Sequence, residues 1–338
     1  MPLYIRKIVR GSIAYRPWRF LFSPFYPFVY PISSVLRRRT FSVVKNILVV
    51  NLGAIGDNLL STPALRALKK EFPQANIDVI TGSKISLQAY NNNPRVRKVF
   101  RVKQFSAGSI KYKFSKKKNI FTSTLKAFIY YPALVIKILL SNYQLGLNFC
   151  AFEGGANFSN ILMYLAGIPK RLGNFGTYQE LLTNKKDRLK STHWVDIYLE
   201  IVSLAGAETS DQELEFFTSD SDERFSDEFL KENKINSGEI VFSVCPGGST
   251  YINNKKWGID KFGEVINRLN TKYSFCVLLL GLEEDEPSIY LLQDKLKVKS
   301  AVLLGAKLSQ VASLLRRSDV LITNDNAILH LADAVKVP

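Results

Sequence analysis

Short apolar segments alternate with segments of helical periodicity from residue 46 onward. In the first half of the chain the apolar segments are 46–52, 77–81, 98–102 and 145–150. After the first of these, apolar residues recur at helical spacing, at Leu60, Ala64, Ala67, Leu68 and Phe72. Because parallel strands need helical crossovers between them, this alternation predicts an α/β fold with a parallel sheet.

The same alternation returns in the second half, after an acidic, serine-rich stretch. We predict strands at 240–245, 274–280, 300–305 and 319–324, with helices near 259–271, 286–296 and 308–316. The chain of 338 residues is also too long for one ordinary core. We therefore expect an N-terminal arm at 1–45, a first domain at 46–206, a linker at 207–238 and a second domain at 239–338.

The charge is distributed unevenly between the two halves. Residues 1–152 contain 25 lysines and arginines and three acidic residues, a net charge of +22, whereas the remainder has 21 basic and 26 acidic residues, a net charge of −5. Such a basic half indicates an anionic partner: nucleic acid, a membrane surface or an acidic substrate. Without a recognisable nucleic-acid-binding motif, we favour a membrane or an acidic glycolipid.

The arm at 1–45 places aromatic residues between basic clusters and contains Pro17, Pro24, Pro27 and Pro31. These prolines argue against a membrane-spanning helix, and no signal-peptide pattern is present. The composition favours an anchor at the membrane interface; the alternative is an arm packed on its own domain or on a partner. The apolar segment 127–140 is short and contains Pro132 and Lys137, so we expect a buried or surface-lying helix that forms a second membrane-facing element.

Cys150, Cys245 and Cys276 are widely spaced and form no CxxC pattern, which argues against a disulfide framework and a zinc site. We expect a reducing cytosolic environment.

The loop "GAIGD" at 53–57 follows the first predicted strand and opens a helix. Gly53 and Gly56 allow a tight turn and the close approach of a ligand, but no Walker lysine follows. Asp57 is either a helix cap or a catalytic base, and the residues alone favour the cap.

Two further loops follow predicted strands in the second half. The first, "CPGGSTYINNKKW" at 245–257, combines glycines, hydroxyls and lysines that suit a diphosphate, at Gly247, Gly248, Ser249, Thr250, Lys255 and Lys256. Its alternative is an ordinary solvated loop with Trp257 as a core anchor. The second, "TNDNAILHLADAVKVP" at 323–338, places Asp325 and His330 across a strand-to-helix turn, where the helix N-terminus suits an anionic nucleotide.

These segments together resemble the family 9 glycosyltransferases, the ADP-heptose:lipopolysaccharide heptosyltransferases. The matching segments lie in the family's order, at 53–73, 143–173, 193–206, 245–257 and 323–338. The resemblance implies a GT-B fold of two Rossmann-like, doubly wound domains facing a central cleft. It also implies inverting, metal-independent transfer from a nucleotide sugar, which is a substrate and not a cofactor.

The resemblance assigns site residues by position. It implies two catalytic residues. Asp57 is the base, and Lys255 binds the phosphate of the nucleotide sugar. It implies a donor site at Gly247, Gly248, Ser249, Thr250, Lys256, Asp325, Asn326, Ala327 and His330, with an acidic residue at Glu284 or Asp285, of which we choose Glu284. We place the acceptor beside Gly53, Ala54, Gly56 and Arg66. We expect a peripheral enzyme on the cytoplasmic face of the inner membrane.

The sequence departs from the family pattern in three respects. The loop before the lysines is rich in asparagine and a residue longer than usual, which leaves the phosphate-binding role open between Lys255 and Lys256. Ala327 stands where the family has glycine, and the chain ends at Pro338, where the family continues with another strand, a loop and helices. We therefore expect an incomplete second domain, and we retain a membrane-associated scaffold without catalysis as an alternative. A metal-binding DxD at Asp220 and Asp222 carries little weight, because these residues lie in the acidic stretch and suit a solvated or capping role.

Overall fold

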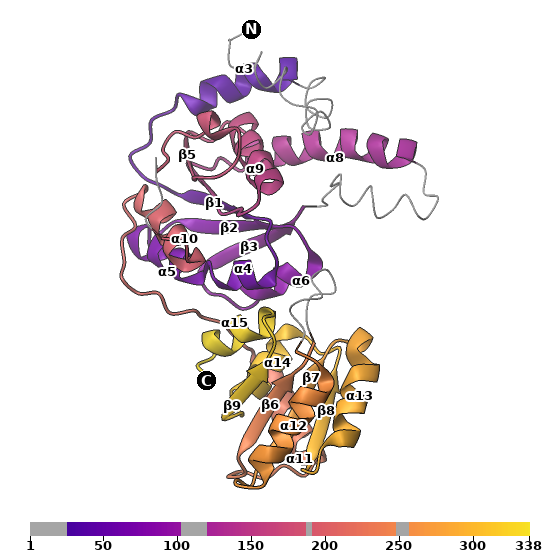
Figure 1. Ribbon diagram of the computed structural model, residues 1–338. Coiled ribbons are helices and arrows are strands. Elements are labelled where there is room, and N and C mark those ends of the chain that lie inside the picture. The colour runs from indigo at the N-terminus through magenta and orange to yellow at the C-terminus, as the bar shows by residue number, and fades with distance from the viewer. Residues whose placement is uncertain (1–25, 103–119, 187–190, 248–256) are drawn as a thin grey trace. The chain divides into compact units, whose positions relative to one another are not determined.

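The computed structural model describes residues 26–102, 120–186, 191–247 and 257–338 (Figure 1). The chain divides into two compact units. The first comprises Met1–Gly53, Ala64–Ser83 and Arg95–Ser210, and the second comprises Ala54–Pro63, Lys84–Pro94 and Asp211–Pro338. Each unit contains a parallel sheet with helical crossovers, so the predicted α/β class is confirmed.

The first unit is built on a five-stranded parallel sheet in the order β3-β2-β1-β4-β5. Its strands are β1 (Asn46–Asn51), β2 (Asn76–Thr81), β3 (Val96–Arg101), β4 (Leu145–Asn148) and β5 (Lys170–Leu172). The four strands predicted in this half are confirmed to within a few residues. β5 was not predicted, because its three residues are too few to show a pattern.

Helices cover both faces of this sheet, which explains why its central strands are apolar along their length. Leu48 and Val50 of β1 share a core with α8 (Ile120–Leu140) and α9 (Glu153–Leu165). The opposite face is covered by α5 (Thr62–Glu71) and α10 (Trp194–Ser203), as Figure 1 shows. The short helix η3 (Gln179–Leu181) follows β5. The predicted surface-lying helix at 127–140 is thus part of α8.

The helix α3 (Tyr26–Arg37) belongs to the N-terminal arm and packs against α9. Arg37 donates a hydrogen bond of 2.9 Å from Nη1 to the carbonyl oxygen of Tyr164, and its guanidinium carbon lies 3.9 Å from the centre of that ring. Gly167 has a φ of +71°, and a Cβ there would lie 2.9 Å from Cβ of Leu36. The end of the arm therefore packs on its own unit, while residues 1–25 lie outside the described residues.

The second unit is built on a four-stranded parallel sheet in the order β8-β7-β6-β9. The strands are β6 (Val241–Cys245), β7 (Cys276–Gly281), β8 (Ser300–Leu304) and β9 (Val320–Thr323). The helices that follow β6 along the chain are α12 (Ile259–Asn270), η5 (Glu283–Asp285), α13 (Glu286–Lys295), α14 (Leu308–Leu315) and α15 (Ala327–Ala334). All four strands and the three predicted helices are confirmed.

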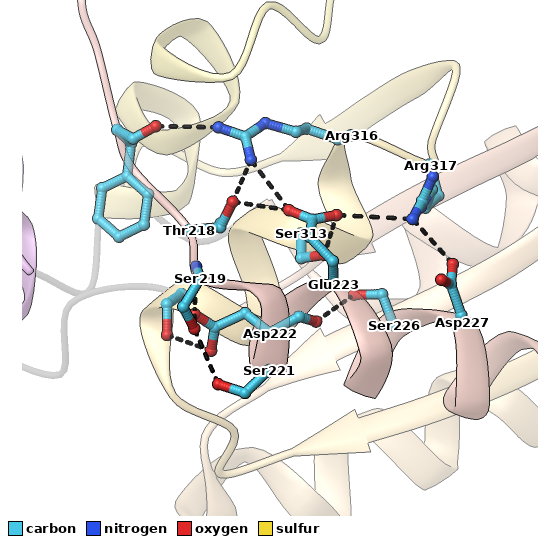
Figure 2. Close-up of polar contacts among 12 residues, drawn as sticks. Thr218, Ser219, Ser221, Asp222, Glu223, Ser226, Asp227, Ser313, Arg316 and Arg317 are labelled. Carbon is cyan, nitrogen blue, oxygen red and sulfur yellow. Dashed lines mark hydrogen bonds and ion pairs between the residues drawn. The ribbon is translucent and has the colours of Figure 1, made fainter. Parts of the chain in front are cut away.

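Part of the stretch that we expected to be a linker forms the helix α11 (Asp220–Glu232). Its acidic side chains are hydrogen-bonded to α14. Asp222 accepts a hydrogen bond of 2.8 Å from Ser309. Glu223 accepts one of 2.9 Å from Ser313, as Figure 2 shows. Asp222 also accepts the backbone N–H of Ser219 at 2.9 Å, so it caps the helix. This polar packing makes 220–232 an element of the second unit, and the capping interpretation of the DxD residues holds for Asp222.

The second unit also takes in two short segments from the first half of the chain. They contain α4 (Ile55–Leu59), α6 (Lys84–Leu87) and η2 (Gln88–Tyr90). The side chain of Gln88 accepts the backbone N–H of Leu308 at 2.8 Å, and Thr62 accepts that of Glu215 at 3.2 Å. Residues 54–63 and 84–94 therefore depart from the expected domain boundaries.

Among the helices of the described residues, none combines the length and the apolar character needed to cross a membrane.

Candidate active site

The polar candidates of the second unit gather where β6 and β9 end. These strands are neighbours, and the strand order reverses between them, since β7 follows on one side and β9 lies on the other. In open parallel sheets, ligands bind beyond the carboxyl ends of the strands at such a reversal. Gly247 follows β6 and Asn326 follows β9, so the fold places both at this position.

Asn326 holds the end of β6 to the start of α15. Its Oδ1 accepts the backbone N–H of Ile328 at 2.9 Å, which makes it the N-cap of the helix. Its Nδ2 donates to the carbonyl oxygen of Gly247 at 2.9 Å and to Oγ1 of Thr323 at 2.9 Å. This one carboxamide therefore orients the N-terminus of α15, where an anionic group is favoured.

Asn324 holds both ends of the segment that carries the predicted phosphate-binding lysines. The side chain is buried; Nδ2 donates to the carbonyl oxygen of Pro246 at 2.6 Å, and Oδ1 accepts the backbone N–H of Trp257 at 3.1 Å. Asn324 was not predicted from the sequence, where its signal was a polar residue directly after the apolar strand β9.

The remaining candidates of this loop lie outside the described residues, namely Gly248, Ser249, Thr250, Lys255 and Lys256. Their roles stay predictions.

Of the two acidic candidates after β7, Asp285 is the one that lies against the end of β6. A Cβ at Gly247 would be 2.9 Å from Oδ2 of Asp285, so the absence of a side chain at Gly247 permits this approach. Glu284, which we chose from the sequence, is exposed. Cys245, at the end of β6, is buried, and burial raises the pKa of its thiol to about 11. This cysteine is thus suited to packing and not to nucleophilic chemistry.

Asp57 lies in the first turn of α4, directly after the turn that follows β1. Its Oδ2 accepts the backbone N–H of Ala54 at 2.8 Å, and the side chain is half-buried. Asp57 therefore caps the helix from its third residue, whereas the N-cap position that we predicted for it is occupied by Ala54.

The buried side chain of Asn58 anchors the same short helix. It donates from Nδ2 to the carbonyl oxygen of Ala54 at 2.7 Å and accepts the hydroxyl of Tyr90 at 2.9 Å. Tyr90 was not predicted, because it contributes through a contact 32 residues away along the chain. These bonds fix the turn that carries Asp57.

Gly56 brings α4 and α15 into direct contact within the second unit. A Cβ at Gly56 would lie 2.7 Å from Cδ2 of His330, so only glycine leaves room for the imidazole at this position. Asp57 is the next residue, and Asn326 is the N-cap of the helix that carries His330. The structure therefore brings a candidate base and candidate donor residues into one unit, although 273 positions of sequence separate Asp57 from His330.

Four other predicted residues lie near these elements along the chain. Ala327 is the first residue of α15, and Asp325 is exposed beside it. Gly53 ends the first segment of the first unit, and Arg66 is half-buried on α5 of the same unit.

The sequence profile of glycosyltransferase family 9 (heptosyltransferase) matches residues 154–338, more than half of the chain. This chain belongs to glycosyltransferase family 9. The family 9 glycosyltransferase has the expected GT-B fold, formed from two parallel α/β units of Rossmann-like strand order. Among curated proteins, none matches the sequence.

Solved structures with similar folds come from the same family. A family 9 glycosyltransferase from Veillonella parvula superposes with a TM-score of 0.70 at 18% identity, over 89% of this chain and 82% of that one. E. coli ADP-heptose lipopolysaccharide heptosyltransferase II gives a TM-score of 0.61 at 18% identity, over 87% and 83% of the chains. E. coli heptosyltransferase WaaC with ADP-2-deoxy-2-fluoro heptose gives 0.62 at 18% identity, over 87% of each chain. At this identity the likeness supports the fold of the family 9 glycosyltransferase.

Proposed function

We propose that this glycosyltransferase moves a heptose from ADP-heptose to an anionic acceptor of the lipopolysaccharide-core or lipid A type. The observation that carries the proposal is the contact between Gly56 and His330, which joins the turn of Asp57 to the helix capped by Asn326. In such an enzyme, the base that deprotonates the acceptor must lie close to the site that binds the donor. E. coli structures of WaaC with ADP and with a fluorinated ADP-heptose support the choice of donor.

In the proposed donor site, the nucleotide diphosphate lies beyond the carboxyl ends of β6 and β9. The N-terminus of α15 presents backbone N–H groups and the positive end of its dipole to the phosphates. The carboxylate of Asp285 beside Gly247 suits hydrogen bonds from sugar hydroxyls. Lys255 and Lys256 supply positive charge from the intervening segment.

In the proposed reaction, Asp57 removes the proton of the acceptor hydroxyl as its oxygen attacks the anomeric carbon. A new carbon–oxygen bond forms on one face of the sugar while the bond to the diphosphate breaks on the other, so the configuration inverts. The departing ADP takes the electron pair, and Lys255 with the amides of α15 stabilises its developing charge. The proposal requires no metal and no cofactor.

The proposed acceptor is anionic and lies at the cytoplasmic face of the inner membrane. The net charge of +22 over residues 1–152 supports this choice, because phosphates and acidic sugars are attracted to such a field. Peripheral contact with the membrane would bring the enzyme to a lipid-linked acceptor.

The test is a transfer assay with ADP-heptose and a lipid A precursor that carries acidic core sugars. We expect the product to gain the mass of one heptose and ADP to be released in equal amount, with the same rate in EDTA. A reaction without acceptor is the control for donor hydrolysis. Absence of both transfer and calorimetric binding of ADP-heptose would contradict the proposal and favour a scaffold.

A further inference from the structure

Two helices of the first unit present apolar side chains to the solvent. On α8 the exposed residues follow one helical stripe, at Ile129, Ala133, Ile136 and Leu140, and Leu140 is 75% exposed. The opposite side of the same helix is also apolar, since Tyr131, Val135 and Ile138 are buried in the core. A surface helix of a soluble protein normally has a polar outer side, so α8 lacks the expected polarity.

The outer side of α3 is also apolar, although here a polar residue is buried. Ser33 is fully buried against the unit, whereas Ile32 and Val35 are 56% and 64% exposed. Both α3 and α8 pack against α9, and Figure 1 shows all three on the same side of the sheet. The apolar stripe of α8 and the apolar pair of α3 therefore belong to one region of the first unit.

The charges beside these apolar residues have one sign. Arg38 and Arg39 are exposed directly after α3, and Lys137 is exposed on α8, where its Nζ lies 4.2 Å from the ring centre of Phe100. Residues 26–53 and 120–152 contain no aspartate or glutamate. Exposed apolar side chains on two segments whose charged residues are all cations match an anionic membrane, whose headgroups attract lysine and arginine while its interface accepts the apolar groups.

We propose that the outward faces of α3 and α8 dock on an anionic lipid bilayer, with both helices lying along its surface. This inference deepens the proposed function, on whose membrane association it rests, by naming the surface that makes the contact. A bilayer is favoured over a second copy of the chain, because a symmetric contact would press two basic faces without acids against each other. The stripe from Ile129 to Leu140 extends about 16 Å along α8, a length that lies along a membrane and does not cross it.

The docking surface is tested by co-sedimentation of the full chain with vesicles of phosphatidylglycerol and phosphatidylethanolamine. The double variant Ile136→Ser/Leu140→Ser should bind these vesicles at least about tenfold more weakly, because two exposed apolar side chains lose their burial in the interface. The double variant Arg38→Gln/Arg39→Gln should lose about fivefold per charge, and only on anionic vesicles and at low salt. Vesicles of phosphatidylcholine alone should bind the wild type weakly.

The matched control is Tyr273→Ser/Leu291→Ser, which removes two apolar side chains of the second unit that are 57% and 52% exposed. It should bind vesicles like the wild type. All variants should keep the wild-type melting temperature and transfer to a deacylated, water-soluble acceptor, which separates a failure of this surface from a failure of the proposed function. Unchanged vesicle binding by Ile136→Ser/Leu140→Ser would overturn the inference. A wild-type dimer in sedimentation velocity that this variant converts to monomer would also overturn it, by assigning the stripe to a second copy.

Discussion

Two aspartates of the basic half, Asp78 in the first unit and Asp57 in the second, have opposite surroundings. Asp78 is buried in the middle of β2, where Arg97 donates to both of its oxygens at 3.0 and 2.5 Å and Tyr143 donates its hydroxyl at 2.6 Å. Asp57 is half-buried beyond the end of β1 and accepts the backbone N–H of Ala54. With Glu71 these are the only acidic residues among the first 152.

The difference separates a structural carboxylate from a candidate catalytic one. Hydrogen bonding to Asp78 raises the pKa of Arg97, and burial together with the bond to Asp78 raises the pKa of Tyr143. Both shifts indicate that Arg97 keeps its charge and that Tyr143 keeps its hydroxyl proton. Asp57 lies instead at the edge of the fold where α/β proteins bind ligands, and a backbone amide orients it. Position relative to the strand thus distinguishes the two roles.

The largest expected effect comes from Asp57→Asn. The asparagine keeps an oxygen for the N–H of Ala54 but cannot take a proton from the acceptor, so the rate of transfer should fall by about 10³-fold or more. Calorimetry should show donor affinity within a factor of about two of wild type, and the melting temperature should change little. Glu71→Gln, an exposed acid of the same half of the chain, is the control and should keep full activity. Wild-type turnover by Asp57→Asn would exclude Asp57 as the base.

Asp78→Asn should have the opposite profile. It removes the charge that Arg97 and Tyr143 surround, and breaking buried pairs costs about 3–5 kcal/mol. Because the side chain of Arg97 is 37% exposed and can turn to water, we expect about 2 kcal/mol of lost unfolding free energy. Urea denaturation measures this loss. The rate per folded molecule should stay at the wild-type value; a large loss of rate with intact stability would assign Asp78 a role in catalysis.

The elements that we predicted are those whose buried residues are apolar, because such residues form a hydrophobic pattern in the sequence. β1 is a nearly continuous apolar run because helices cover both faces of its sheet, and the strands of the second sheet are mostly apolar. α11 was missed for the converse reason. Its buried residues include Asp222 and Ser226, and polar side chains satisfied by another helix give no apolar periodicity.

The position of a candidate site residue was predictable where that residue lies shortly after a strand in the sequence. Asp57, Gly247 and Asn326 each lie within six residues of the end of a strand, so topology alone places them at an edge. Asn324 and Tyr90 were missed, because each contributes through bonds to distant segments that no local pattern encodes. The grouping of residues 54–63 with the C-terminal half depends in the same way on tertiary contacts, among them the contact of Gly56 with His330.

Glu223 extends the comparison, because it lies in the second unit like Asp57 and accepts hydrogen bonds from side chains like Asp78. Burial opposes its ionisation, yet hydrogen bonds from Thr218 and Ser313 and the charges of Arg316 and Arg317 lower its pKa below the ordinary value (Figure 2). The unfolded chain therefore binds the proton first as pH falls. The stabilisation is complete above the ordinary glutamate pKa of about 4.3 and is lost as the pH falls through the lower value of the folded protein.

Glu223→Gln should accordingly destabilise the second unit at pH 7 by about 1 kcal/mol or less, because the carboxylate is 34% exposed and its ion pairs are screened. The difference from wild type should shrink as urea denaturation is repeated at pH 5 and pH 3.5. Glu228→Gln, on an exposed position of the same helix, is the control and should follow the wild type at each pH. A deficit of Glu223→Gln that grows on acidification would contradict the assignment. A loss of transfer rate at pH 7 without loss of stability would show that partners alone do not separate structural from catalytic carboxylates in this enzyme.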